Sequence, residues 1–483
     1  MSATPRVVVG APASGHGKTA VAIGLLAAYA ARGLTVTGFK TGPDHVDAAY
    51  LGLAASRRAR NLDPRLVGAA RIGPLFGYGA RGADLAVVEG TMGLYDGLSG
   101  RTDGESTAQL AGLLRAPVVL VVDAGAMGQS VAALVHGFRA YDELLWLGGV
   151  VLNRVASGRH EELLREALDD IGVPVLGVLR RQDLAAAGAL PPRSAGVVPA
   201  LHRGLDAVRV VRRLGEVVGR SVDLDRVLAL ARSAPRLAAD PWSPAEAVAD
   251  SASTGDLVRP ATRPAVAVAT GYGYAETADL LAAAGAEVVP VDPLRDETLP
   301  ADVRGLVVGA GLPESYADEL SANVRLRAAV AALAGAGRPV AAEGAGLVWL
   351  CRELDGHPMC GVLDATARTN DLGIVGYREA TAASTSALLP AGTTVTGHKM
   401  HRTVVSPRAG VHPAWSWPSG QPEGYVWRGV HASYLALHWA GCPEIASRFV
   451  SAARAGSEAP TSGPPTSGPP DPGPPDEPAE QAA

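Results

Sequence analysis

A glycine-rich loop near the start of the chain carries the clearest chemical signal. The apolar segment Val7–Val9 runs into GAPASGHGKT (10–19), and an alanine- and leucine-rich helix is predicted to follow at once. Backbone N–H groups of such a loop bind phosphate, helped by the helix N-terminus. Its glycines let the loop turn, its lysine reaches the terminal phosphates of ATP, and its threonine ligates Mg²⁺. These residues are Gly15, Gly17, Lys18 and Thr19. Pro12 replaces the first glycine of the strict motif, and the alternative is a glycine-rich turn without a ligand.

Two later loops add acidic residues and a second lysine. Lys40 opens the segment KTGPDHVD after one predicted strand, and Glu89 opens EGTMGLYDG after another. Carboxyl ends of parallel strands meet at the ligand-binding edge of a sheet. We therefore expect Asp44 and Glu89 to hold Mg²⁺ directly or through water, and Lys40 to stabilise a transferring phosphoryl group. For either acid, the alternative is a helix N-cap. Asp123 and Asn153, at two further strand ends, are candidates for metal-loop and base contacts.

The chain contains lysine at only three positions, Lys18, Lys40 and Lys399, whereas arginine is spread throughout. In such a background a retained lysine indicates a need for a compact ammonium group, although chance retention is the alternative. We expect Lys399 to bind an acidic ligand; the alternative is a solvated surface lysine.

Short apolar segments that alternate with helical ones must position these residues. The helical segments include Thr19–Arg32 and Gly128–Ala140. Nearly continuous apolar runs are typical of parallel strands covered on both faces, so residues 1–231 are predicted to form repeated βαβ units. The predicted strands are Val7–Val9, Val36–Phe39, Leu85–Val88, Val118–Val122, Gly149–Leu152 and Val175–Val178.

The remaining chain divides by composition. Residues 232–264 are rich in proline, serine and aspartate and are predicted to be a linker. A second α/β pattern occupies 265–454, and the proline-rich tail 455–483, which repeats TSGPP, is predicted to be disordered. The strands predicted in the second domain are Ala265–Ala269, Val288–Val291, Gly305–Gly309 and Pro339–Ala342.

Composition excludes several classes of protein. The formal net charge is −5, and no basic stripe indicates nucleic-acid binding. The three cysteines have no metal-like spacing, and no apolar run is long enough for a membrane span. We expect a cytoplasmic enzyme with no nucleic-acid or membrane partner.

Taken together, these motifs resemble the cobyrinic acid or hydrogenobyrinic acid a,c-diamide synthase family. The similarity runs from Arg6 to about Phe449 through APASGHGKT, FKTGPDHVDAAY, NLDP, VVEGTMGLYDG, STAQLA, LNRV, GLPESYADELSAN and VHASYLALHWA. It implies a dethiobiotin-synthetase-like P-loop domain joined to a class I glutamine-amidotransferase-like α/β domain. The implied reaction is Mg-ATP-dependent amidation of the a and c acetate side chains of a corrinoid through an acyl phosphate. The resemblance also implies that Asp47 lies near the activated carboxylate, and it favours a homodimer.

The second domain departs from the family where its glutaminase chemistry belongs. Gly344 stands at the position of the nucleophilic cysteine, and Ala436 at that of the activating histidine. His438 matches a second histidine that the family also carries, so it is not an obvious replacement. Lys399 replaces a family glutamate, and Ala310 lies in the glycine-rich oxyanion loop. Since thioester chemistry needs a thiolate and a base, the chain's own glutaminase activity is predicted to be absent.

The sequence therefore predicts a ligase that forms carbon–nitrogen bonds and uses free ammonia or ammonia from a glutaminase partner. One alternative is a degenerate paralogue that binds ATP and corrinoid and assists an intact synthase. Another is an amidoligase for a different modified tetrapyrrole.

Overall fold

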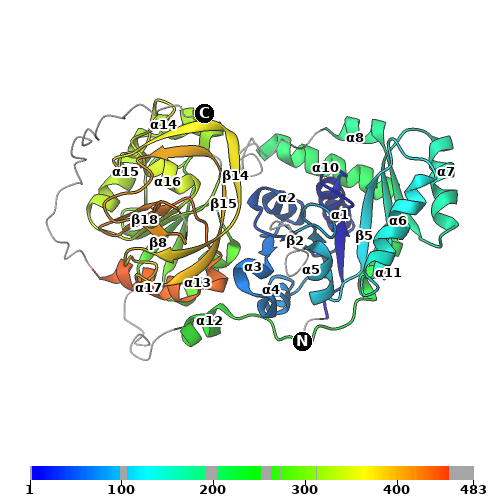
Figure 1. Cartoon of the computed structure of the whole chain (residues 1–483), viewed down its shortest axis with the longest axis horizontal. Coiled ribbons are helices and arrows are strands. Elements are labelled where there is room, and N and C mark those ends of the chain that lie inside the picture. Colours follow the sequence, from blue (N-terminus) through cyan, green and yellow to red (C-terminus); the bar gives the residue numbers. More distant parts are fainter. Residues whose placement is uncertain are drawn as a thin grey trace, which may run out of the picture.

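Two α/β domains lie side by side along the long axis of the molecule (Figure 1). The computed structural model describes residues 3–97, 106–188, 190, 204–251, 263–270, 273–311, 313–418 and 420–455. The predicted disordered tail lies outside these residues, apart from Ala455.

The first domain is built on a seven-stranded, fully parallel sheet of order β3-β2-β4-β1-β5-β6-β7. Its strands are β1 Arg6–Gly10, β2 Val36–Thr41, β3 Arg60–Leu62, β4 Leu85–Glu89, β5 Val118–Asp123, β6 Leu147–Val155 and β7 Val175–Arg180. The six predicted strands are present. The edge strand β3 was not predicted, because Arg60 and Asn61 make it short and polar.

Helices cover both faces of this sheet, so alternate residues of β1 enter different cores: Val8 packs in one cluster, Val7 and Val9 in the other. Gly24 allows α1 to lie against α10, since a Cβ there would be 2.3 Å from Val218 Cγ2. The helices are α1 Lys18–Ala31, α2 His45–Ala55, α3 Pro64–Val67, α4 Ile72–Gly79, α5 Thr107–Leu113, α6 Ser130–Tyr141, α7 Gly158–Asp169, α8 Arg181–Ala187, α10 Gly204–Ser221 and α11 Leu224–Arg232.

Part of the segment expected as a linker, 232–264, is folded. Trp242 is buried, and its ring meets Tyr78 edge-on at 5.3 Å. Helix α12, Pro244–Ser251, follows and packs near α13 and α17 of the second domain. Proline and serine at 241–244 obscured this short helix in the sequence.

The second domain combines two sheets. A six-stranded sheet has the order β17-β18-β11-β10-β8-β9, parallel except for β17. A smaller sheet is dominated by the hairpin of β14 and β15, which arches along the side facing the first domain (Figure 1). The strands are β8 Ala265–Ala269, β9 Glu287–Val291, β10 Val303–Val308, β11 Val340–Glu343, β12 Glu353–Leu354, β13 His357–Pro358, β14 Thr366–Ala382, β15 Thr394–Ser406, β16 Trp415–Ser416, β17 Tyr425–Trp427 and β18 Val430–Ser433.

The helices of this domain are α13 Ala275–Ala283, α14 Ala317–Ala322, α15 Val324–Gly335, α16 Ala345–Leu350 and α17 Glu444–Arg454. Helices α13, α16 and α17 contact the larger sheet, whereas α14 contacts β13 of the smaller one. The hairpin was not predicted, because β14 mixes charged residues and glycines and shifts register between Thr369 and Ile374.

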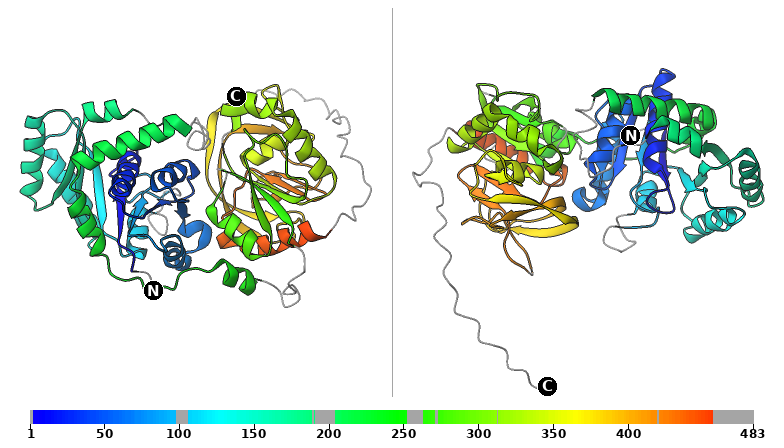
Figure 2. Two further views of the ribbon diagram at one scale, coloured as in Figure 1. Left: turned by 180° about the vertical axis from the view of Figure 1, so that it is seen from behind. Right: turned by 90° about the horizontal axis from the view of Figure 1, so that it is seen from above.

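Direct contacts join the domains. Arg60 of β3 pairs with Glu276 and Asp279 of α13, at 2.7 Å each. Tyr377 of β14 donates a hydrogen bond to Asp63 Oδ2 at 2.7 Å. Two further views show the same side-by-side arrangement (Figure 2). The domain faces therefore meet through charged and polar side chains as well as apolar ones.

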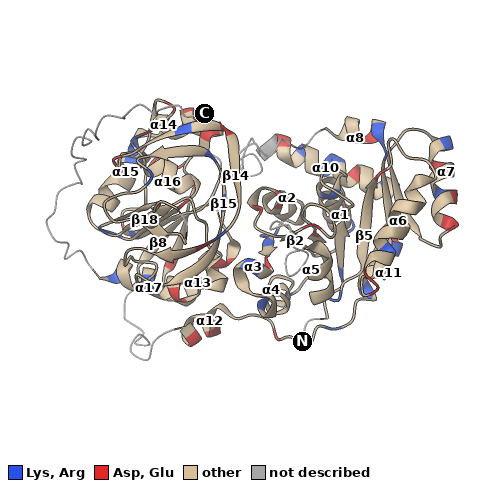
Figure 3. Cartoon of the chain, in the orientation of Figure 1, with Lys and Arg blue, Asp and Glu red and all other residues tan. Residues whose placement is uncertain are grey.

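Acidic and basic residues are interspersed over both domains in the view of Figure 3. Within the described ranges, no helix is both long and apolar enough to cross a membrane.

Candidate functional site

The glycine-rich loop connects β1 to α1, and its glycines are required by the backbone. Gly15 and Gly17 have φ values of 86° and 99°, in the region that side chains other than glycine rarely adopt. A Cβ at Gly17 would lie 2.3 Å from Asn153 Nδ2, which donates to His16 O at 2.7 Å. Asn153, proposed for base contacts, thus braces the loop from β6.

The lysine and threonine of the loop face the end of β4. Lys18 Nζ donates to Ala13 O at 3.1 Å and also to Met92 O. Thr19 Oγ1 donates to Glu89 Oε1 at 2.5 Å. The predicted phosphate residues and the predicted acid Glu89 therefore lie together at the carboxyl edge of the sheet.

Lys40 and two acids form a buried cluster at this edge. Lys40 Nζ lies 2.9 Å from Glu89 Oε1 and 2.8 Å from Asp47 Oδ2, and all three side chains are buried. Burial raises the pKa of Glu89 to about 7, and the neighbouring Asp47 acts in the same direction. Burial would lower the pKa of Lys40, but Glu89 and Asp47 outweigh it and hold that pKa above its usual value. The cluster thus keeps a charged lysine beside two carboxyl groups.

The residues at this edge fit a magnesium ion. Glu89 Oε2 is buried and has no hydrogen-bond partner among the described residues, and the Thr19 hydroxyl lies beside the same carboxylate. No group of three or more histidine, cysteine, aspartate or glutamate side chains in the described ranges is arranged to hold a metal. A site of one or two protein ligands completed by phosphate oxygens and water suits Mg²⁺.

Asp44 acts in the structure as the N-cap of α2. Its Oδ1 accepts hydrogen bonds from the backbone N–H groups of Val46, at 2.8 Å, and Asp47, at 3.2 Å. The N-cap alternative is therefore present, and the metal role of Asp44 remains a prediction. Asn61, for which the sequence suggested no role, donates to Asp44 O at 2.9 Å and to Gly42 O at 2.8 Å. It fixes the acidic loop against β3.

In the second domain, the turn between β11 and α16 has the shape of a nucleophile elbow without a nucleophile. Gly344 has φ 51° and ψ −105°, and its N–H donates to Ser433 O at 2.8 Å. Ala436 exchanges two backbone hydrogen bonds of 2.9 Å with His398. Neither position carries a group that can attack an amide or take a proton.

Cys351 does not replace the missing thiol. It is fully buried beyond the end of α16, where its Sγ donates to Leu347 O at 3.4 Å. Burial raises the pKa of this thiol to about 12, so it stays protonated at neutral pH.

Comparison with known proteins places both domains in one family. Residues 7–189 match the CobQ/CobB/MinD/ParA nucleotide binding domain, and residues 268–442 match the CobB/CobQ-like glutamine amidotransferase domain. The chain is 55% identical over 480 residues to the hydrogenobyrinate a,c-diamide synthase of Streptomyces coelicolor, covering 94% of this chain and 98% of that protein. The chain belongs to the a,c-diamide synthase family.

Other members of the a,c-diamide synthase family are also similar along most of their length. The hydrogenobyrinate a,c-diamide synthase of Mycobacterium tuberculosis is 48% identical over 458 residues, covering 92% of this chain and 97% of the relative. The cobyrinate a,c-diamide synthase of Synechococcus sp. is 36% identical over 469 residues, covering 92% and 98%. The predicted family and the predicted two-domain α/β fold class are confirmed.

The environment of Lys399 differs from the one that the sequence predicted. The side chain is buried, its Nζ forms an ion pair with Glu423 Oε2, and it lies 4.5 Å from the centre of the Trp417 ring. Glu423 Oε1 accepts from Ser433 Oγ at 3.1 Å and from Tyr434 N at 2.8 Å. Lys399 is thus satisfied inside the domain, and the prediction that it binds an acidic ligand is wrong. It is not a solvated surface lysine either.

A cavity of about 560 Å³ beside the glycine-rich loop includes Asp123. Asp123 Oδ1 accepts from Gly125 N at 3.0 Å, and its Oδ2 pairs with Arg154. The cavity is lined by His16, Asp123, Gly125, Ala126, Met127, Arg154 and Arg181. The expectation that Asp123 and Asn153 make metal-loop and base contacts remains a prediction.

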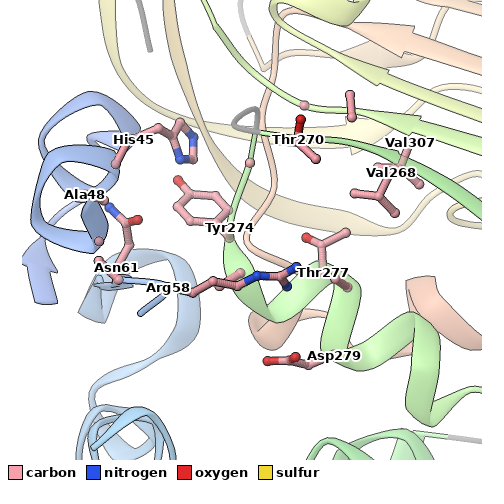
Figure 4. Close-up of a pocket in the computed structure, with 18 of the residues that line it drawn as sticks. His45, Ala48, Arg58, Asn61, Val268, Thr270, Tyr274, Thr277, Asp279 and Val307 are labelled. Carbon is pink, nitrogen blue, oxygen red and sulfur yellow. The ribbon is translucent and has the colours of Figure 1, made fainter. Parts of the chain in front are cut away.

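A larger cavity, of about 790 Å³, lies between the domains, and no motif in the sequence indicated it. His45, Ala48 and Asn61 reach it from the first domain; Tyr274, Val307 and Glu343 reach it from the second. Figure 4 shows Tyr274 extending from the start of α13 towards His45 and Asn61. The cavity was not predicted because its two walls come from segments that are more than 200 residues apart in the sequence, such as those of Asn61 and Tyr274.

Proposed function

We propose that this protein is an ATP-dependent ligase that amidates the a and c acetate side chains of hydrogenobyrinic or cobyrinic acid, using ammonia that its own second domain does not make. The observation that carries the proposal is the similarity, through both domains, to proteins named a,c-diamide synthases. This substrate implies that the protein is a cytoplasmic enzyme of cobalamin biosynthesis.

Amidation requires that the substrate carboxylate, which is a poor acyl donor, is first activated. A substrate carboxylate that takes the γ-phosphoryl group of ATP becomes an acyl phosphate; ammonia then forms a bond to the carbonyl carbon, and phosphate leaves with the electrons of the broken C–O bond. Lys18 is positioned to neutralise the terminal phosphates. Lys40, which is held by Asp47 and Glu89, is proposed to stabilise the negative charge that develops on the transferring group.

Glu89, Thr19 and Asp44 are the residues proposed to hold Mg²⁺. The ion supplies charge neutralisation between the phosphate oxygens when it is bound. The unpaired Glu89 Oε2 supports this assignment. Asp47, at the start of α2 and 2.8 Å from Lys40, is proposed to lie near the carboxylate that is activated.

The proposed nitrogen source follows from the residues at the turn between β11 and α16, which lack a nucleophile and a base. Gly344 has no side chain, and Ala436 can neither accept nor donate a side-chain proton. Without a thiolate, a glutamine amide cannot be converted to a thioester and free ammonia. We therefore propose free ammonia, or ammonia from a glutaminase partner, as the nucleophile.

The test uses purified full-length protein with Mg-ATP and hydrogenobyrinic acid, or cobyrinic acid, in parallel reactions with ammonium chloride and with glutamine. Product mass should show conversion to the diamide with ammonium and only background with glutamine. A glutaminase-competent a,c-diamide synthase serves as the positive control for glutamine. If neither nitrogen source gives product while ATP and corrinoid still bind, the protein is instead an accessory paralogue of an intact synthase.

A further inference from the structure

Strand β3, Arg60–Leu62, lies between the second domain and the strand that carries Lys40. It has three residues, which is the lower limit of strand length, and it stands at the edge of the sheet. It pairs in parallel with β2, so that Asn61 is opposite Lys40. A strand this short has few backbone hydrogen bonds to fix its position, so that position depends on its other contacts.

Two residues of β3 hold the acidic loop, residues 42–44, which connects β2 to α2. Asn61 Nδ2 donates to the carbonyl oxygens of Gly42, at 2.8 Å, and Asp44, at 2.9 Å. Leu62 O accepts from Gly42 N at 3.0 Å. Asn61 is only 3% exposed, so little water competes for its hydrogen bonds. The acidic loop, and with it the first turn of α2 that carries Asp47, therefore follows the position of β3.

The second domain contacts β3 through Arg60. The guanidinium group donates to Glu276 Oε1 and to Asp279 Oδ2 of α13, at 2.7 Å each. The Arg60 and Glu276 side chains are 12% and 1% exposed. A planar guanidinium bound to two carboxylates is fixed in orientation as well as in position. Because Arg60 directly precedes Asn61, helix α13 fixes the strand one residue away from the side chain that holds the acidic loop.

Two further contacts from the second domain lie at either end of this region. Tyr377 of β14 donates to Asp63 Oδ2 at 2.7 Å, directly after β3. The ring of Tyr274 lies 4.4 Å from the ring of His45, the first residue of α2 (Figure 4). The second domain thus contacts both β3 and the start of α2.

We propose that Arg60 is a positioning residue of the ligase reaction, through which Glu276 and Asp279 of the second domain set the position of β3 and of the acidic loop. The proposal rests on the proposed function, because the loop and the start of α2 carry residues assigned there to Mg²⁺ and to the activated carboxylate. None of these contacts involves the side-chain chemistry missing at Gly344 and Ala436. The second domain therefore takes part in amidation without any glutaminase residue.

A displaced loop acts on the rate of the chemical step. A misplacement of reacting groups by about 1 Å costs up to about 100-fold in rate. A variant that removes one of the two Arg60 ion pairs leaves the other in place, so we expect a smaller fall in kcat, of about tenfold. The KM for ATP should stay nearly the same, because Lys18 and Thr19 follow β1 and not β3.

Glu276→Gln and Asp279→Asn test the ion pairs in the full-length protein, since each removes one charge and keeps the size of the side chain. Each should lower the kcat of amidation with ammonium by about tenfold. In an Asn61→Ala background, where the side chain that holds the loop is gone, Glu276→Gln should have little further effect on kcat. A contact that only joins the domains would lower kcat by the same factor in both backgrounds, and that result overturns the proposal.

Val330→Ala is the control for a general loss of stability. Val330 is fully buried in α15, and its apolar cluster contains residues of the second domain only. The substitution removes buried methyl groups and therefore destabilises this domain without altering β3. At a temperature well below unfolding, Val330→Ala should keep the kcat of the wild type.

Hydrogen–deuterium exchange followed by mass spectrometry gives a measure of loop position that does not depend on amidation. The backbone N–H of Gly42 donates to Leu62 O, and the N–H groups of Val46 and Asp47 donate to Asp44 Oδ1. These hydrogen bonds slow exchange in the wild type as long as the loop keeps its place.

Glu276→Gln should speed exchange in peptides that cover residues 42–47, and Val330→Ala should not. Exchange that is unchanged in both Glu276→Gln and Asp279→Asn overturns the positioning role, whatever the activity of the variants. If the wild type amidates and both variants keep its kcat, Arg60 has no positioning role and the proposed function stands. If the wild type does not amidate, the proposed function fails, and the exchange rates alone decide whether the second domain holds the loop.

Discussion

We predict that any side chain introduced at Gly344 lowers the free energy of unfolding. Its backbone, at φ 51° and ψ −105°, lies in a region that strains other residues. A Cβ added there would lie 3.0 Å from Ala310 Cα and 3.1 Å from Ala310 Cβ. The substitution Gly344→Ala tests this, since it adds only the Cβ that a restored cysteine would also need.

The expected loss has two sources. Backbone strain costs about 1–3 kcal/mol, and crowding against Ala310 adds on the order of 1 kcal/mol. We therefore expect Gly344→Ala to lower the free energy of unfolding by about 2–4 kcal/mol. Ala310→Gly removes one of the two close contacts, so the pair should show a coupling energy of about 1 kcal/mol.

Urea unfolding followed by tryptophan fluorescence measures the cycle of both single variants and the double variant. Five of the seven tryptophans report on the second domain: Trp349, Trp415, Trp417, Trp427 and Trp439. Gly335→Ala, at the end of α15, is the control, because a Cβ there would meet no other described atom within 4 Å. A neutral Gly344→Ala, or strictly additive effects with Ala310→Gly, would refute the reasoning.

Three further substitutions address the ATP site. Lys18→Ala should abolish ATP turnover with the fold intact, because Lys18, the first residue of α1, is the residue proposed to contact the phosphates; retained turnover in a phosphate-release assay would sink the assignment. Lys40→Met should destabilise the protein by about 3–5 kcal/mol in thermal unfolding, because it leaves two buried carboxyl groups unpaired; Lys40→Met with Glu89→Gln should lose less, and an equal loss would contradict the cluster. Mg²⁺ affinity, measured calorimetrically with nucleotide present, should fall by up to about tenfold per pH unit below 7, where Glu89 is protonated, and level off above it. In Glu89→Gln this pH dependence should vanish; its persistence would assign the titration to another group.

The sequence was sufficient for the parts of the fold and site that depend on local patterns. Continuous apolar strands and a glycine-rich turn before a helix reflect steric and burial rules that act over a few residues, so β1, β2 and β4 could be located. Lys18, Lys40 and Glu89 then followed, because parallel strands must end at one edge. That Thr19 and Lys40 share one Glu89 oxygen was not predictable, since it depends on side-chain geometry.

What the sequence could not show arises from contacts between distant segments. Lys399 was predicted to be an anion ligand because its partner, Glu423, lies in the segment before β17, and only the fold brings that segment beside β15. The stack of His45, Tyr274 and His438 brings together three segments separated by more than a hundred residues, and only tertiary packing creates it. Asp44 could have been either a metal ligand or a cap, and local backbone geometry determined the cap.

The central claim is that amidation nitrogen comes from free ammonia and not from glutamine in this chain. One reaction tests it directly: purified protein, Mg-ATP and hydrogenobyrinic acid with equal concentrations of unlabelled ammonium and amide-¹⁵N glutamine, followed by mass spectrometry of the diamide. Gly344 and Ala436 predict a product that carries no ¹⁵N. A product enriched in ¹⁵N, in protein free of other glutaminases and with the ammonium pool still unlabelled, would contradict the account.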